Sequence, residues 1–196
     1  NSSSQTQTIT VDDQTAPTAI CKNATIQLNS SGTATLYTSQ VNNGSYDNCG
    51  SVSLSLSKTS FNCTNTGNNT VTLTVTDACG NISTCSSTVT VQDLTAPTIV
   101  CPANVTVNYN PALCNLAVNN PTVTDNCGET LRTWVMTGVT TGSSPLTGIN
   151  NVGTQIFNLG LTTITYTTKD AAGNSATCSF TVTINPSLTT SSVSVS

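Results

Sequence analysis

The sequence predicts an all-β protein built of two tandem antiparallel β-sandwiches, and three observations carry that prediction. Landmark motifs occur twice in the same order, and apolar residues alternate with Ser and Thr along several short segments. Nine cysteines accompany a chain in which only 6% of residues are charged. Alternation with a period of two is typical of strands with one buried face, and disulfides commonly stabilise domains with small cores. Because no segment sustains the three-and-four apolar spacing of an amphipathic helix, we predict no helix.

The repeat is defined by three landmarks. In chain order, Thr15–Thr18 with Cys21 recurs as Thr95–Thr98 with Cys101, Asp47–Gly50 recurs as Asp125–Gly128, and Asp77–Asn81 recurs as Asp170–Asn174. The second copy is longer, and its excess falls in the Gly/Ser/Thr-rich stretch 137–160, which predicts a surface loop. We expect a first module at 13–92, a second module at 93–185 and a Ser/Thr-rich tail at 186–196.

The alternating segments explain why these modules are predicted to be sandwiches. Apolar residues at every second position make up three segments: Val52, Leu54 and Leu56; Val71, Leu73 and Val75; and Cys178, Phe180, Val182 and Ile184. Several short strands separated by Asn, Asp and Gly turns are typical of an immunoglobulin-like sandwich. Residues 6–13 copy the pattern of 87–93, so 1–12 is either the end strand of a preceding module or a strand lent to a neighbour.

Composition excludes several classes of function. The formal net charge is -4, so the chain offers no basic stripe to a nucleic acid. The sequence has no run of 18 apolar residues, so we expect no segment of it to span a membrane. Without histidine, neither a Ser-His-Asp triad nor a mixed Cys/His zinc site is possible, and we predict that the protein is not an enzyme. Disulfides are then the expected use of the cysteines, which indicates a secreted protein in an extracellular or cell-surface setting.

The motifs resemble those of a known family, the hyalin repeat (HYR). The resemblance rests on Asp-x-Thr-Ala-Pro-x-Ile-x-Cys-Pro at 93–102, Asp-Asn-Cys-Gly at 125–128 and Asp-Ala-Ala-Gly-Asn-x-Ala-x-Cys-x-Phe-x-Val at 170–182. The first copy departs from it, with Lys22 in place of Pro and Cys79 inside its turn. The resemblance implies immunoglobulin-like modules of extracellular adhesion proteins. The Thr- and Asn-rich version is most similar to bacterial surface adhesins, including those of Bacteroidota.

The repeat suggests a disulfide pattern without fixing it. Cys21 with Cys85 and Cys101 with Cys178 occupy matching positions, so each pair is expected to tie the first strand of a module to the last. The most economical remaining pairs are Cys49 with Cys63 and Cys114 with Cys127. Cys79 is then left over, either as a free thiol in a turn or as part of an intermolecular or swapped bridge.

Six of the eight acidic residues fall into two matching triads, which are Asp13, Asp47 and Asp77, and Asp93, Asp125 and Asp170. In an immunoglobulin-like sandwich the segments that carry them meet at one pole. Clustered carboxylates repel unless a cation bridges them, and an oxygen-only set favours Ca²⁺. The triads are therefore either calcium sites at the module junctions or Asx turns, in which each Asp caps its own backbone.

Three hypotheses for function follow. The modules are disulfide-stapled spacers or a stalk in a long adhesive surface protein, with identical or similar modules as partners. Alternatively, the chain is a subunit of a filament, a homopolymer assembled by strand addition. A third possibility is direct binding of a carbohydrate or surface through loop 137–160. Trp134, Met136 and Tyr166 are either core residues, which strand patterning favours, or part of a sugar-binding face.

Overall fold

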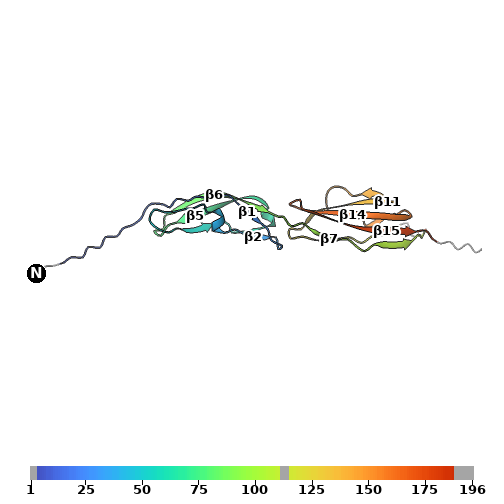
Figure 1. Ribbon diagram of the computed structural model, residues 1–196, viewed down its shortest axis with the longest axis horizontal. Helices are drawn as coiled ribbons and strands as arrows, with labels where there is room; N and C mark the ends of the chain where they lie inside the picture. Colours follow the sequence, from blue (N-terminus) through green and yellow to red (C-terminus); the bar gives the residue numbers. More distant parts are fainter. Residues whose placement is uncertain (1–3, 111–114, 188–196) are drawn as a thin grey trace, which may run out of the picture. The chain divides into compact units, whose positions relative to one another are not determined.

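The structure is a computed structural model that describes residues 4–110 and 115–187, and the chain divides into two compact units at Asp93. Figure 1 shows that strands are the main secondary structure of both units, with loops between them. The two tandem immunoglobulin-like sandwiches predicted from the sequence are confirmed. Cys114 and most of the predicted tail, 186–196, lie outside the described residues.

The first unit is built on a four-stranded sheet in the order β1-β6-β5-β3, with a second, two-stranded sheet formed by β2 and β4. Its elements are β1 (Ala24–Gln27), β2 (Thr33–Thr35), α1 (Thr38–Val41), β3 (Ser53–Leu56), β4 (Ser60–Asn62), the short 3-10 helix η1 (Cys63–Asn65), β5 (Gly67–Thr76) and β6 (Ile82–Gln92). The predicted alternation places Val71, Leu73 and Val75 of β5 in the core, while the Thr residues between them are half-buried.

The second unit repeats this plan with a five-stranded sheet in the order β12-β11-β14-β15-β8. Its elements are β7 (Thr98–Val100), β8 (Val105–Asn108), β9 (Leu116–Ala117), β10 (Thr122–Thr124), β11 (Glu129–Gly138), β12 (Gly142–Ser143), β13 (Thr154–Gln155), β14 (Gly160–Asp170) and β15 (Ser175–Asn185). Two small antiparallel sheets, β7 with β10 and β9 with β13, complete it. Tyr166 and Phe180 stack in its core with ring centroids 6.4 Å apart.

The structure corrects two details of the predicted fold. One edge pair in each main sheet is parallel, because β1 runs alongside β6 and β8 runs alongside β15 in the same direction. The apolar pattern of a strand is the same in either direction, so alternation could not reveal this pairing. The other correction is α1, whose four residues are too few to show helical periodicity.

A buried ion pair distinguishes the second unit and was not predicted. Arg132 donates from Nε and Nη2 to the two carboxylate oxygens of Glu129, at 2.8 and 2.6 Å. Its Nη1 donates to Asn151 Oδ1, and Thr168 Oγ1 donates to Glu129 Oε1. The network therefore fastens the far end of the long loop to β11 and β14. In the first repeat Leu54 occupies the position of Arg132.

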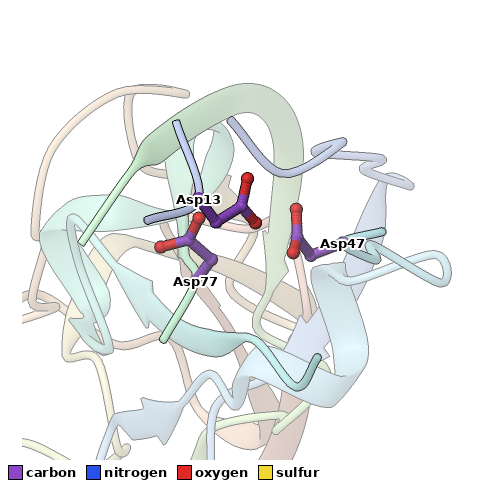
Figure 2. A group of neighbouring side chains, drawn as sticks. All are labelled: Asp13, Asp47 and Asp77. Carbon is purple, nitrogen blue, oxygen red and sulfur yellow. The ribbon is translucent and has the colours of Figure 1, made fainter. Parts of the chain in front are cut away.

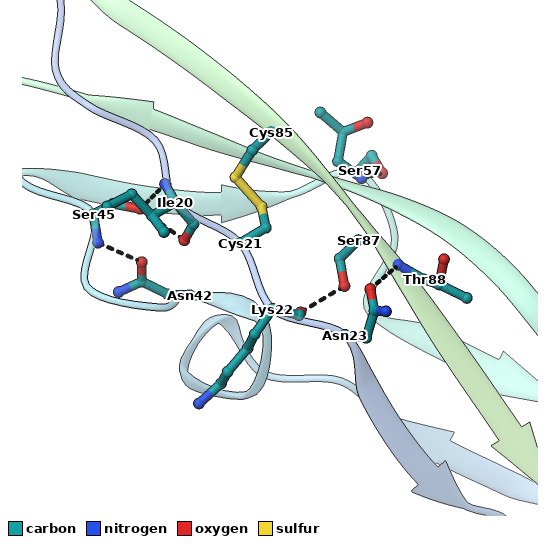
Figure 3. Close-up of a disulfide and its surroundings, with 11 residues drawn as sticks. Ile20, Cys21, Lys22, Asn23, Asn42, Ser45, Ser57, Cys85, Ser87 and Thr88 are labelled. Carbon is teal, nitrogen blue, oxygen red and sulfur yellow. Dashed lines mark hydrogen bonds between the residues drawn. A yellow bond between two sulfur atoms is a disulfide. The ribbon is translucent and has the colours of Figure 1, made fainter.

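The structure contains Cys21–Cys85 and Cys101–Cys178, the two disulfides indicated by the repeat. Figure 3 shows the first of them beside two hydrogen bonds that join the same chain segments. Ser87 Oγ donates to Lys22 O, and Thr88 N donates to Asn23 Oδ1. The disulfide and these bonds hold the start of the module against β6 before the parallel pairing of β1 begins.

The predicted pairing of Cys49 with Cys63 is wrong. Cys49 is a free, exposed thiol, whereas Cys63 is bonded to another cysteine. Cys49 lies two residues beyond Asp47, which clusters with Asp77 at the far end of β5, while Cys63 precedes the start of that strand. A strand of 10 residues spans about 33 Å, and a disulfide requires Cα atoms within about 7 Å.

The other predicted cysteine assignments have separate outcomes. Cys79 is a free, exposed thiol in the turn between β5 and β6. Cys127 belongs to a disulfide, but its predicted partner Cys114 lies outside the described residues.

Candidate metal centre

The structure brings the first predicted triad together. Asp13, Asp47 and Asp77 each offer a carboxylate oxygen, and these oxygens lie within 4.8 Å of one another. Figure 2 shows the three carboxyl groups gathered from separate parts of the first unit. Asp13 lies in the segment that leads into the module, Asp47 lies in the loop before β3, and Asp77 follows β5.

Local backbone hydrogen bonds hold these carboxylates in place. Asp13 Oδ1, Asp47 Oδ2 and Asp77 Oδ1 each accept from the backbone N–H two residues further on, at 2.9 Å in all three cases. This is the Asx turn that was the alternative to a metal site. The two interpretations are compatible, because each turn uses only one oxygen of its carboxylate.

Asn81 is a residue of the cluster that sequence reasoning missed. Its Nδ2 donates to Asp77 Oδ2 at 2.7 Å and to the backbone oxygen of Asp13 at 2.8 Å. It thereby ties the turn after β5 to the lead-in segment. The signal was present in the repeated Asp-Ala-x-Gly-Asn motif, in which the final Asn recurs with the Asp.

The second triad has the same construction. Asp93, Asp125 and Asp170 also bring carboxylate oxygens within 4.8 Å of one another. Asp125 Oδ2 accepts from Cys127 N at 2.8 Å, and Asp170 Oδ2 accepts from Asn174 Nδ2 at 2.7 Å. Asp93 and Asp170 are only 4% and 3% exposed, which makes this the more buried of the two clusters.

The pKa of Asp77 is held below its ordinary value of 3.8. Burial of the carboxyl group acts in the opposite direction and raises the pKa, but hydrogen bonds outweigh it. Donors are the Asn81 side chain and the backbone N–H groups of Asn81, Gly80 and Cys79. Because these groups donate to the charged form, Asp77 stays ionised at neutral pH.

The carboxylate oxygens of both clusters are the kind of ligand that a hard divalent cation prefers. Asp47 Oδ1 and Asp125 Oδ1 are buried, and neither has a hydrogen-bond partner in the part of the chain that the structure describes. Within that same part, no Lys or Arg forms an ion pair with Asp13, Asp47 or Asp77. A buried carboxylate oxygen without a donor is costly, and a cation bound to oxygen ligands removes the cost.

The three residues considered for a sugar-binding face lie in or against the core of the second unit. Tyr166 is fully buried, Met136 is 4% exposed and Trp134 packs against them while half-buried. Burial raises the pKa of the Tyr166 hydroxyl, although its hydrogen bond from Val152 N and the nearby Arg132 charge act in the other direction. These side chains stabilise the sandwich.

Comparison with known proteins bears on the second repeat directly. Residues 92–184 match the HYR domain, and this range contains Asp93, Asp125, Asp170 and the Cys101–Cys178 disulfide. The second repeat is therefore similar to the HYR domain. The first repeat shares the landmark motifs of the second and resembles the HYR domain in that way. No curated protein sequence matches the chain.

Solved structures with a similar fold are only distantly related to the chain. Human mucin-like protocadherin EC1-2 is 13% identical with a TM-score of 0.43, and the match covers 87% of this chain and 98% of that one. The titin domains z1z2, solved with telethonin, are 15% identical with a TM-score of 0.41, covering 90% and 100%. Drosophila N-cadherin EC1-3 is 12% identical with a TM-score of 0.37, covering 88% and 68%.

The HYR match and the disulfides support an extracellular, adhesion-type repeat module. Across residues 4–110 and 115–187, no helix has the length and apolar character needed to cross a membrane.

Proposed function

We propose that the two modules are calcium-stabilised spacers in a long, adhesive cell-surface protein, where they hold a binding region away from the cell. The observation that carries this proposal is the recurrence of one carboxylate cluster in both repeats, each with a buried Asp oxygen that has no described donor. A spacer has to resist bending and unfolding under load. Each cluster joins the lead-in segment of its module to two loops, so a bound ion would stiffen that segment.

The residues divide the work of binding between them. Asp13, Asp47 and Asp77 would supply one carboxylate each to the first ion, and Asp93, Asp125 and Asp170 would supply one each to the second. Asn81 and Asn174 would orient the carboxylates of Asp77 and Asp170 by donating to one oxygen of each. Ca²⁺ takes six to eight oxygen ligands, so water or backbone oxygens complete each site.

The test is thermal unfolding of the chain with calcium and after chelation. Trp134 is the only tryptophan, so its fluorescence reports the second unit, while calorimetry follows both units. Calcium is expected to raise the melting temperature of wild type and to have a much smaller effect on the second unit of Asp125→Asn. Asp12→Asn is the matched control, because Asp12 is an exposed neighbour of the first cluster outside it. Identical melting of wild type with calcium and with chelator would refute the calcium site.

A filament subunit is the second candidate, and the N-terminal segment favours it. Ile9 and Val11 are 78% and 90% exposed, whereas Val89 and Val91, at the matching positions of β6, are 0% and 1% exposed. Residues 8–11 therefore have the sequence of a core strand without a sheet around them. Such a segment is suited to adding a strand to another module.

Deleting residues 1–12 separates the filament from the spacer. If the chain assembles by lending this strand, the shortened protein stays folded and monomeric where the full chain forms polymers in light scattering. A spacer shows the same state of assembly with and without the segment.

Direct binding through loop 137–160 is favoured by its exposed apolar side chains. Leu146 and Ile156 are 84% and 66% exposed, and Leu159 is half exposed. Replacing these three residues with Ser should abolish adhesion of the parent protein if the loop carries the ligand site, and should leave it unchanged if the modules are spacers.

A further inference from the structure

Cys49 stands out when the two repeats are aligned by sequence. Asp47-Asn48-Cys49-Gly50 matches Asp125-Asn126-Cys127-Gly128, and the two loops have the same hydrogen bond. Cys49 N donates to Asp47 Oδ2 at 2.9 Å, and Cys127 N donates to Asp125 Oδ2 at 2.8 Å. Cys127 is in a disulfide, yet Cys49 is a free, exposed thiol.

The other free cysteine provides the contrast. Cys79 also lies in an exposed turn, but its counterpart in the second repeat is Ala172, so the repeat assigns it no bridge. A disulfide is therefore expected of the cysteine in the Asp-Asn-Cys-Gly loop because of its position in the repeat. Exposure alone does not predict one, since Cys79 is exposed as well. Of these two thiols, only Cys49 has a matching position that is covalently bonded.

The sequence before the first module indicates what lies next to this loop. Residues 8–11 match the last residues of β6, and the segment they belong to leads directly to Asp13, which clusters with Asp47. A segment with the pattern of a last strand thus reaches the pole that carries Cys49. If residues 8–11 are the last strand of a preceding module, the cysteines of that module are the nearest candidates for a partner of Cys49.

We propose that Cys49 is a covalent attachment point, bonded in the assembled protein to a cysteine of the HYR-like module that precedes it. The bond forms by thiol–disulfide exchange. The Cys49 thiolate attacks a disulfide oxidant, forms a mixed disulfide and releases one thiol. The partner thiolate then attacks the Cys49 sulfur, the S–S bond forms, and the second oxidant thiol leaves. Two protein thiols lose two electrons and two protons, and the oxidant disulfide is reduced to two thiols.

This bond adds a covalent link between modules to the spacer role, but it does not require calcium. Its failure and the failure of the calcium site are therefore distinguishable. Calcium is tested by melting, whereas the link is tested by locating the Cys49 sulfur chemically.

The experiment is disulfide mapping of the parent protein, isolated from its source with iodoacetamide present to block free thiols. We expect the Cys49 peptide joined to a cysteine peptide from the preceding module, and the Cys79 peptide recovered alkylated. A Cys49 peptide joined to Cys49 of a second copy would overturn the assignment to the preceding module and identify a covalent dimer. A fully alkylated Cys49 would overturn the attachment point altogether.

Matched variants give a second readout in the same protein. Limited proteolysis between the preceding module and the first module should leave the two fragments joined on a non-reducing gel. Reduction should separate them. Cys49→Ser should separate them without reduction, while Cys79→Ser should not change the pattern. Equal behaviour of the two variants would contradict the proposal. Because Cys49 is exposed and forms no disulfide within its own unit, the Ser variant should fold normally.

Discussion

The two repeats share a frame but fill it differently. Both order their main sheet in the same way, β1-β6-β5-β3 in one and β8-β15-β14-β11 in the other, and both carry one disulfide between the first segment and the last strand. Both also gather three carboxylates at the lead-in pole. The second repeat adds the strand β12, the long loop and the buried pair of Arg132 with Glu129.

The comparison separates what the fold requires from what one module has acquired. The disulfide, the alternating strands and the carboxylates are present in both repeats, so they belong to the frame that the two modules share. The ion pair is absent from the first repeat, where Leu54 fills the position of Arg132. Its role is therefore local, and it fixes a loop that only the second module has.

Removing a disulfide should have the largest effect, and it should be similar in the two repeats. The Cys21–Cys85 and Cys101–Cys178 bonds span 64 and 77 residues. Loops of this length contribute about 4 kcal/mol each in the chain-entropy model. We expect each double Cys→Ser variant to lose this much in the unfolding free energy of its own unit, measured by calorimetry. A loss of less than about 1 kcal/mol in either unit would show that its packing suffices without the bond.

Breaking the ion pair should affect the second repeat alone. Glu129→Ala leaves the Arg132 guanidinium buried without its carboxylate, which typically costs about 3 kcal/mol. Urea unfolding followed by Trp134 fluorescence measures this loss. Glu129→Ser combined with Arg132→Leu restores the residues of the first repeat and should recover part of the stability. If the double variant is less stable than Glu129→Ala, the pair itself contributes more than its desolvation costs.

Parts of the molecule also differ in how far the sequence predicts them. The strands around Val71 and Phe180 were predictable because burial of one face leaves a period of two, and the carboxylate clusters followed from the repeat. The parallel edge pairs left no mark in the sequence, since alternation does not encode strand direction. Short separation along the chain favours a bond between Cys49 and Cys63, but the intervening strands place them at opposite ends of the unit.

Calcium should sharpen the comparison of the two carboxylate clusters. We expect calorimetric titration to find two sites per chain. At free calcium about 100 times Kd, each site would add about 2.7 kcal/mol to the stability of its unit. The second cluster is the more buried, so its carboxylates are screened less by water and it should bind more tightly. Asp77→Asn and Asp170→Asn should each remove one calcium site. A titration of wild type that shows only one site per chain would contradict two independent centres.

The smallest expected effect is on the acid stability of the first repeat, measured with chelator present. The pKa of Asp77 is lowered in the folded state, because the donors around it outweigh burial. A lowered pKa stabilises the fold at any pH above the value in the unfolded chain, and that stabilisation is lost as the pH falls through the folded value. The melting temperature of the first unit should therefore decline as the pH falls below about 4.

Asp77→Asn tests the origin of that decline, because an amide keeps the size of the side chain but does not ionise. The variant should melt lower than wild type at neutral pH, and the difference should narrow on acidification as wild-type Asp77 becomes protonated. Asp12→Asn, which changes an exposed carboxyl group next to the cluster, should leave the wild-type profile intact. If the difference between Asp77→Asn and wild type stays constant across this range, the hydrogen bonds of Asp77 act through geometry and not through its charge.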